Sequence, residues 1–437
     1  MLDRLASPLQ GLRLPQVPAG LRVALWCIVG LAAFWVGSQW LQDWVVFLGV
    51  HIPQPDVQLD YLKGMGLAIL IGLSILFWPV SAEERAALMV VWLVKVFVVL
   101  GFMLFYEHKF GEELDSFQYY RYGTELQEWA AWRSNALIYN VCAMTNWLVP
   151  NSFHSLKIAF ALVGFLSIYV IYRAVCIASG RCDVRIFYLL ALFPSIVFWS
   201  AIVGKDPIVL AGLALYFLGA VGWERRHEGG YIVAMTAGMF AVMLIRPWMV
   251  LVMLLPAPCL FLSGAARRSP LAALVFLVLA VVGVQAGASY FVQTYNISDV
   301  NDLSQAADTV RSNFAGDYTE GSDDGRGIVA LVAGMFTALF RPLPGEVPNA
   351  FGLITGLENL LLLGFFVGAL ARKEWTRWRE PLVMWALVFV LLWSACYSGV
   401  ALGNFGALVR FKLQVLPLII CLLLYFHRGR PVPAGPK

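Results

Sequence analysis

One stretch of the chain, YEHKFGEELDSFQYYRYGTELQEW, combines a carboxylate with several aromatic hydroxyls directly after a long apolar run. Asp115 and Tyr119 are four residues apart, so on a helix they share one face, and Tyr120 is adjacent. Aromatic rings stack on sugar rings, and a carboxylate can take a proton from a hydroxyl group. The pattern favours sugar recognition, and the alternative is a solvated helix whose tyrosines form an interfacial belt.

A second candidate site lies in FPSIVFWSAIVGKDPIVLAG, residues 193–212, which joins two apolar segments almost without a loop. We expect Asp206 to be an N-cap and Pro207 the first helical residue. Free backbone N–H groups and the positive end of the helix dipole then lie beside Lys205 and form an anion site. The predicted anion is the phosphate or diphosphate of a lipid carrier. In the alternative, Asp206 and Pro207 only start a helix and Lys205 reaches toward the membrane interface.

Further charged and polar side chains fall on the same predicted face of the membrane. Cations on the outer face run against the positive-inside trend, so they need a reason to be there. We predict that they hold an anionic headgroup or a lipid-linked phosphate, and pairing with local carboxylates is the alternative. These residues are Arg246 before Pro247, Arg341 and Glu346 in RPLPGEVPN, and Asn404, Arg410 and Lys412 in GNFGALVRFK.

Two charged residues lie inside apolar segments. Lys95 is near the middle of VVWLVKVFVVL, and Glu358 is about two turns into FGLITGLENLLLL. Because charge within a bilayer is costly, each is expected to face the protein interior and find a partner, and one arrangement pairs them with each other. Together with Glu346 and Asn404 they are predicted to line a polar cavity, with a purely structural contact as the alternative.

The amino-acid composition indicates the type of protein that must position these residues. Apolar residues make up 60% of the 437-residue chain and charged residues only 13%, whereas a soluble domain needs about 25% charged residues to cover its surface. The chain is therefore predicted to be an all-α polytopic membrane protein that lies in the lipid bilayer. A soluble enzyme, a secreted disulfide scaffold and a disordered chain are excluded, and no nucleic-acid partner is expected.

Metal and cofactor signatures are missing from the sequence. The seven cysteines form no CxxC pattern, and we expect them to be small apolar packing residues. The five histidines form no HxxxH or HExxH pair. The acidic loop 296–326 resembles a lid or a plain flexible loop, and its carboxylates lack EF-hand spacing, so no divalent cation is supported. No cofactor is therefore predicted.

The positive-inside rule gives the predicted topology. The short apolar segments 136–150 and 327–340 become re-entrant or interfacial helices on the outer face, because every strongly basic short loop then lies in the cytoplasm with both chain ends. The expected spans are about twelve, near 23–50, 62–80, 87–106, 157–178, 184–202, 206–222, 231–246, 248–264, 270–292, 351–371, 380–397 and 411–426.

The predicted organisation is one integral membrane domain covering residues 1–437. Its non-spanning parts are a cytoplasmic N-terminal segment, 1–22; an outer loop with the acidic motif, 107–156; an outer flexible loop with an interfacial helix, 293–350; and a cytoplasmic tail, 427–437.

The chain resembles the membrane-embedded glycosyltransferases of the C superfamily (GT-C) in scattered pieces between about 115 and 412. An acidic residue in the first large outer loop precedes a Tyr-rich stretch, and PSIVFWSAIVGKDP is similar to a segment of polyprenyl-phosphate sugar transferases from bacterial polysaccharide clusters. RPLPGEVPNAFGLITGLEN and NFGALVRFKLQVLP look like segments of exopolysaccharide and O-antigen membrane proteins. Two extra spans precede the acidic loop here, which differs from the usual GT-C order.

The resemblance implies a polyprenyl-phosphate-linked sugar donor bound from the bilayer of a bacterial inner membrane. Asp115 would be the general base on an acceptor hydroxyl of a glycan, at a site that faces the periplasm. Lys205, Arg246, Arg341 and Arg410 would stabilise the leaving phosphate, where negative charge grows in the transition state.

Other functions remain open at this stage. A polysaccharide polymerase uses the same chemistry with a lipid-linked oligosaccharide donor. A lipid-linked oligosaccharide flippase is a different class, but a transporter concentrates polar residues near the bilayer midplane, whereas here they gather at the outer rim. A non-catalytic partner of an envelope synthase is the last alternative.

Overall fold

The computed structural model describes residues 37, 40–111, 114–126, 128–149, 151–261, 278, 285, 328–372 and 375–427. Every regular element in this part of the chain is helical. Six of its helices are long and apolar enough to cross a membrane, and α19 with α20, bent by 63° at their junction, make a seventh when counted as one broken span. The predicted all-helical architecture is confirmed for these residues, with several helices long and apolar enough to cross a membrane.

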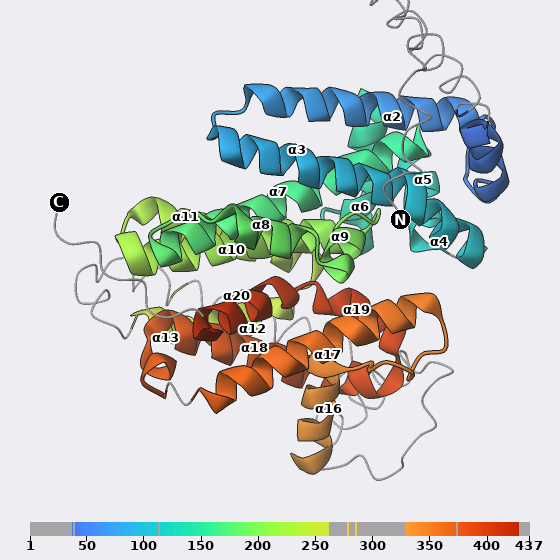
Figure 1. Cartoon of the computed structure of the whole chain (residues 1–437). Coiled ribbons are helices and arrows are strands. Elements are labelled where there is room, and N and C mark those ends of the chain that lie inside the picture. Colours follow the sequence, from blue (N-terminus) through green and yellow to red (C-terminus); the bar gives the residue numbers. More distant parts are fainter. Residues whose placement is uncertain are drawn as a thin grey trace, which may run out of the picture.

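Figure 1 shows the helices in two groups that run roughly side by side. The upper group in that view comprises α2 (Val57–Ser74), α3 (Ala82–Phe97), α4 (Met103–Phe110), α5 (Asp115–Thr124), α6 (Ser134–Leu148), α7 (Phe153–Ser179), α8 (Val184–Ala191), α9 (Pro194–Trp199), α10 (Lys205–Arg226) and α11 (Gly229–Ile245). A short π-helical segment, Val98–Phe102, joins α3 to α4 without ending the span.

The lower group contains the rest of the described chain (Figure 1). It comprises α12 (Met249–Leu254), α13 (Pro258–Phe261), α16 (Ile328–Phe340), α17 (Ala350–Ala371), α18 (Pro381–Gly403), α19 (Phe405–Lys412) and α20 (Leu416–His427). The groups touch where α18 packs on α10, where α20 meets α7, and where α9 meets α17 and α19.

Some predicted spans are divided into shorter helices in the structure, and others lie outside the described residues. The segments 23–50, in large part, and 270–292 lie outside the described residues. The segment 184–202 is divided into α8 and α9, because Pro194 has no N–H to donate and disfavours a helical residue before it. The segment 248–264 is likewise divided into α12 and α13. Pro256 lies in the break, and Pro258 begins α13. Both short segments predicted as outer helices are helical, as α6 and α16.

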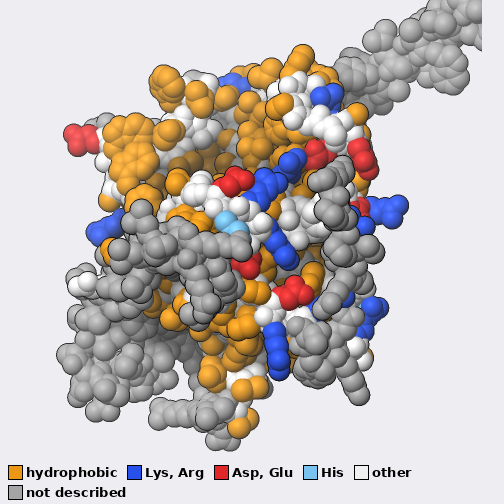
Figure 2. Space-filling model, turned by 90° about the vertical axis from the view of Figure 1, so that its left-hand side faces the viewer, with side chains coloured by type: hydrophobic (Ala, Val, Ile, Leu, Met, Phe, Trp, Pro, Cys, Tyr) orange, Lys and Arg blue, Asp and Glu red, His pale blue; other side chains and the backbone are white. Residues whose placement is uncertain are grey.

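The two ends of the bundle carry different side chains. The ends of α2, α7, α10, α17 and α20 lie together on the left in Figure 1, and α4, α5, α9 and α19 lie at the opposite end. Figure 2 faces the left-hand end and shows Lys and Arg side chains, with Asp and Glu side chains among them, between broad apolar areas. We call this the basic end, and the opposite one the site end. The arginines that belong to the helix ends on the left are Arg85, Arg181, Arg185, Arg225, Arg226, Arg372, Arg377 and Arg379.

Glycines let α10 and α11 approach closely. A Cβ atom on Gly238 would lie 2.3 Å from the backbone oxygen of Gly212 and 2.5 Å from the backbone nitrogen of Tyr216. Small residues at such contacts are typical of helix pairs in membranes, where close backbone packing replaces the hydrophobic effect between helices. This pair matters for function because the N-terminus of α10 and the C-terminus of α11 both lie at the site end.

Gly238→Ala is expected to destabilise the protein by about 1–3 kcal/mol, the usual cost of overpacking a tight interface. The backbone of α10 must move because the clashing atoms belong to the main chain. Thermal unfolding in detergent measures the effect. Gly230→Ala on the same helix is the control, since a Cβ atom there meets nothing within 4 Å. Equal unfolding temperatures for the two variants would contradict this packing.

The short helix α9 is held from both groups of helices. The Lys95 ammonium donates to the Ser200 hydroxyl at 2.6 Å, just after α9. The Glu358 carboxylate accepts the Ser195 backbone N–H at 2.8 Å and also the Ser195 hydroxyl. Lys95 and Glu358 therefore each bind a serine and do not pair with each other, which corrects the sequence-based pairing. The reason is that the break before Pro194 brings polar serines to the depth of both charges.

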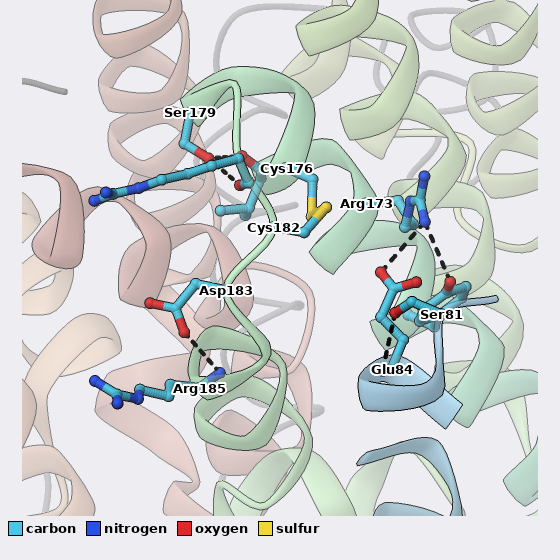
Figure 3. The surroundings of a disulfide bond; sticks show 11 residues. Ser81, Glu84, Arg173, Cys176, Ser179, Cys182, Asp183 and Arg185 are labelled. Atoms are coloured by element: carbon cyan, nitrogen blue, oxygen red, sulfur yellow. Dashed lines mark hydrogen bonds and ion pairs between the residues drawn. A yellow bond between two sulfur atoms is a disulfide. The ribbon is translucent and has the colours of Figure 1, made fainter. Parts of the chain in front are cut away.

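A disulfide closes the turn at the end of α7 (Figure 3), which corrects the prediction that all cysteines are free packing residues. Gly180 ends α7 with a φ of 71°, a conformation that glycine adopts without steric cost. The chain turns back there, so Cys182 comes within a Cα–Cα distance of 4.6 Å of Cys176. Of the other described cysteines, Cys142 is free and buried, as predicted.

Candidate active site

A buried carboxylate lies at the centre of the site end. Asp206 is in the first turn of α10, and only 1% of its side chain is exposed. It accepts a hydrogen bond from Arg246 at 3.3 Å and another from Nε of Arg410. Gly204, not Asp206, is the N-cap of α10, so that expectation is corrected. The reason is that the carboxylate is engaged by two arginines instead of by the backbone.

Arg410 links this buried carboxylate to an exposed one. Its Nη1 atom lies 3.1 Å from Oδ2 of Asp115, and 56% of the Asp115 side chain is exposed. Asp115 is the first residue of α5, where the helix dipole favours a negative charge. Because Arg410 is on α19 and Asp206 on α10, the three residues join three helices that are far apart in the sequence. Of the two carboxylates that Arg410 contacts, Asp115 is thus the one that solvent can reach.

Lys205 is the unpaired cation of this group. It is half-buried at the start of α10, and its ammonium interacts electrostatically with Arg246, Arg410, Asp115 and Asp206. Among the described residues it makes no hydrogen bond and no ion pair. We call these five residues the charged cluster. Three cations share two carboxylates, so the cluster carries one excess positive charge, the electrostatic condition for holding an anion.

Tyr119 borders the charged cluster, whereas Tyr120 does not. A Cβ atom on Gly204 would lie 3.4 Å from the Tyr119 ring and 3.4 Å from Arg410. Burial, reinforced by the Asp115 charge, raises the pKa of Tyr119 well above its ordinary value, so the hydroxyl stays protonated and can donate. The Tyr120 hydroxyl instead bonds Gln54 on the other side of α5.

Arg246 has partners that the sequence did not reveal. It donates to the Tyr397 hydroxyl at 2.9 Å, and its guanidinium lies 4.4 Å from the centre of the Phe411 ring. Tyr397 in turn donates to Oε1 of Gln414 at 3.0 Å. Tyr397 and Gln414 are buried and hold Arg246 in place. A buried glutamine inside an apolar run was the signal available in the sequence.

The remaining predicted residues form a neighbouring group around the start of α19. Arg341 pairs with Glu346 at 2.6 Å, and its guanidinium lies 5.4 Å from the Phe405 ring centre. Burial alone would raise the pKa of Glu346, but hydrogen bonds from Arg341 and from a backbone N–H hold it below its ordinary value. Glu346 therefore stays charged and occupies Arg341, which is not part of the charged cluster.

Lys412 and Asn404 have structural partners in this neighbouring group. Lys412 is buried and donates to Oδ1 of Asn359 at 2.9 Å and to the Arg341 backbone oxygen at 3.1 Å. Asn404 is the N-cap of α19, and its side chain accepts from the Ala407 N–H at 3.0 Å. Both residues thus position α19, the helix that carries Arg410.

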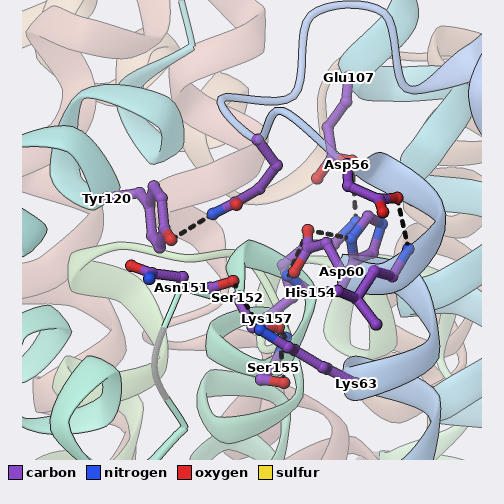
Figure 4. Close-up of polar contacts among 12 residues, drawn as sticks. Asp56, Asp60, Lys63, Glu107, Tyr120, Asn151, Ser152, His154, Ser155 and Lys157 are labelled. Atoms are coloured by element: carbon purple, nitrogen blue, oxygen red, sulfur yellow. Dashed lines mark hydrogen bonds and ion pairs between the residues drawn. The ribbon is translucent and has the colours of Figure 1, made fainter.

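A second set of buried charges, not predicted from the sequence, lies close to α5 (Figure 4). His154 Nδ1 lies 2.6 Å from Oδ2 of Asp60, and Lys157 Nζ lies 2.8 Å from Oε2 of Glu107. All four side chains are less than a tenth exposed, and they tie α2, α4 and α7 together. Phe153, next to His154 on α7, contacts the rings of Phe117 and Tyr120 on α5. The four charged residues therefore support the helix that presents Asp115.

Neither a group of metal ligands among the described residues nor a similar protein indicates what this site does. Within the described ranges, no three His, Cys, Asp or Glu side chains are grouped as ligands of a metal ion. The acidic residues of the loop 296–326 lie outside those ranges. Comparison of the chain with protein-family models, with curated proteins and with solved structures gives no match. The function is therefore argued from the charged cluster alone.

Proposed function

We propose that the protein is a membrane glycosyltransferase that uses a polyprenyl-phosphate-linked sugar donor and transfers the sugar to a hydroxyl of a glycan or lipid-linked acceptor. The observation that carries this proposal is the charged cluster, in which an exposed carboxylate pairs with Arg410 and interacts electrostatically with a half-buried lysine that has no hydrogen bond or ion pair within the described part of the chain. Transfer from a lipid phosphate needs a base for the acceptor and a cation for the leaving group, and the cluster supplies both.

The proposed orientation places the basic end in the cytoplasm and the charged cluster at the periplasmic face of a bacterial inner membrane. It rests on the short basic turns at that end, which the positive-inside rule places in the cytoplasm: Arg181 and Arg185 follow α7, and Arg225 and Arg226 end α10. The full topology in this proposal has about twelve spans with both chain ends inside. The site then lies where a polyprenyl phosphate in the outer leaflet brings its headgroup.

The proposed reaction balances as a displacement at the anomeric carbon. Asp115 takes the proton of the acceptor hydroxyl while the oxygen of that hydroxyl forms a bond to the anomeric carbon. The bond from the anomeric carbon to the phosphate oxygen breaks, and the phosphate leaves with the electron pair. Lys205 and Arg410 stabilise the negative charge that grows on the leaving phosphate. Asp206 and Arg246 hold Arg410 at the position from which it contacts Asp115.

Lys205→Met is expected to lower sugar transfer by roughly 10- to 100-fold, the value of one charge-assisted hydrogen bond. Purified protein in proteoliposomes is given a panel of polyprenyl-phosphate hexoses and polyprenyl-diphosphate oligosaccharides, and release of the lipid phosphate is measured. Lys109→Met is the matched control, since Lys109 is an exposed cation at the site end whose ammonium lies over the Phe110 ring and which is not part of the charged cluster.

The same experiment separates the possible outcomes. Single-sugar products identify a simple transferase, and a ladder of longer glycans identifies a polymerase. Equal rates for the wild type and Lys205→Met, or an equal loss in the Lys109→Met control, would count against the phosphate site. Movement of an intact donor across the bilayer without release of the lipid phosphate would replace the proposal with a flippase.

A further inference from the structure

An apolar cavity lies between the two groups of helices at the basic end, far from the charged cluster. Its volume is about 260 Å³, slightly below the roughly 300–1,000 Å³ of common ligand pockets. One wall comes from α7 and α10, with Val175 and Phe217, and the other from α18 and α20, with Trp385 and Leu418. Such walls suit a hydrocarbon chain and offer almost nothing to a sugar.

The rim of this cavity is charged. Arg181, Asp183, Arg225 and Glu380 all contribute to it. Both carboxylates already have a hydrogen bond, because Glu380 accepts from the Tyr425 hydroxyl at 2.6 Å and Asp183 accepts a backbone N–H at the start of α8. Within the described residues, the guanidinium groups of Arg181 and Arg225 make no hydrogen bond or ion pair. Two free cations therefore stand at the opening of an apolar space.

We propose that this cavity binds one anionic phospholipid, with an acyl chain between the two groups of helices and the headgroup phosphate at Arg181 and Arg225. The membrane is the source of such a ligand, and basic pockets between membrane helices are suited to anionic headgroups. Charge complementarity selects the headgroup: the rim holds two arginines and two carboxylates, and the two guanidinium groups, which have no hydrogen-bond or ion-pair partner among the described residues, are the groups that can pair with a phosphate. A zwitterionic lipid offers the same phosphate but also carries a cation, which the two arginines repel.

Arg181, one of these cations, lies in the turn that follows α7 and begins at Gly180. Arg181 lies between Cys176 and Cys182, whose disulfide closes the turn (Figure 3). The acyl chain would fill the space between α7 and α10 on one side and α18 and α20 on the other, so the lipid joins the two groups of helices. This site is independent of sugar transfer, and its test uses binding only.

The test is native mass spectrometry of the full chain purified in detergent and incubated with equal amounts of phosphatidylglycerol and phosphatidylcholine. The wild type is expected to retain one phosphatidylglycerol with a preference of roughly tenfold or more, as two arginines near the membrane surface provide. Arg181→Gln combined with Arg225→Gln is expected to abolish that preference. Arg185→Gln combined with Arg226→Gln removes the same charge from the same end and is expected to keep it.

A second variant tests the cavity itself. Ala178→Trp fills the space beside the rim without changing any charge, so it is expected to lose the bound lipid altogether. Retention of phosphatidylglycerol by this variant at the wild-type level would place the lipid elsewhere and overturn the proposal. Equal retention of the two lipids by the wild type, or the same loss of preference in both arginine double variants, would overturn it as well.

Discussion

Asp115→Asn is expected to slow sugar transfer by roughly 10²- to 10⁴-fold, the usual contribution of a general base. The amide keeps the size of the side chain and can still accept a hydrogen bond from Arg410, but it cannot take the acceptor proton. The free energy of unfolding is expected to change little, because 56% of the Asp115 side chain is exposed. Initial rates in proteoliposomes and unfolding temperatures in detergent measure the two effects.

Glu125→Gln is the matched control for this loss. It removes one exposed carboxylate just after the same helix, and it is expected to leave the rate unchanged. Wild-type transfer by Asp115→Asn would remove the general base from the proposed mechanism. An equal decrease in both variants would point to a general effect of surface charge at the site end.

Asp206→Asn is expected to lower the free energy of unfolding by about 3–5 kcal/mol, the cost of removing one partner from a buried ion pair. Asp206 is 1% exposed and is the carboxylate shared by Arg246 and Arg410. The variant leaves two arginines at the site end with no buried counter-charge. Thermal or denaturant unfolding of the purified protein, with tryptophan fluorescence as the signal, measures the loss.

Asp115→Asn serves as the control here too, because it removes a carboxylate from the same arginine at an exposed position. A large fall in unfolding temperature for Asp206→Asn and a small one for Asp115→Asn is the expected result. If both variants unfold like the wild type, the cluster is solvated and Arg410 is not held by Asp206. The two substitutions are thus expected to have different effects: Asp115→Asn lowers the rate of sugar transfer, and Asp206→Asn lowers the free energy of unfolding.

Part of this site could be predicted from the sequence because lipid limits where charge can lie. Lys205, Arg246 and Arg410 were grouped on one face by the positive-inside rule, and the structure brings them together around Asp206. The pairings themselves could not be predicted. Arg410 is 204 residues from Asp206 and 295 residues from Asp115 along the chain. Nothing in a single sequence fixes which of several cations reaches a given carboxylate over such separations.

Other contacts at the site end depend on packing that a single sequence does not report. The Asp60–His154 and Glu107–Lys157 pairs were missed because only helix packing makes residues so far apart in the sequence neighbours. For Arg341 the sequence left two possibilities, a phosphate or a local carboxylate, and the structure shows the pair with Glu346, five residues away. Hydropathy alone does not choose between these two partners.

The bond between Cys176 and Cys182 bears on which way up the protein lies. Disulfides persist in the periplasm, whereas glutathione and thioredoxin keep cytoplasmic thiols reduced. In the orientation proposed here the pair faces the reducing compartment, so in growing cells the two sulfurs are thiols held within reach of each other. The opposite orientation keeps them bonded. The oxidation state of this one pair in living cells therefore reports the orientation of the protein in the membrane.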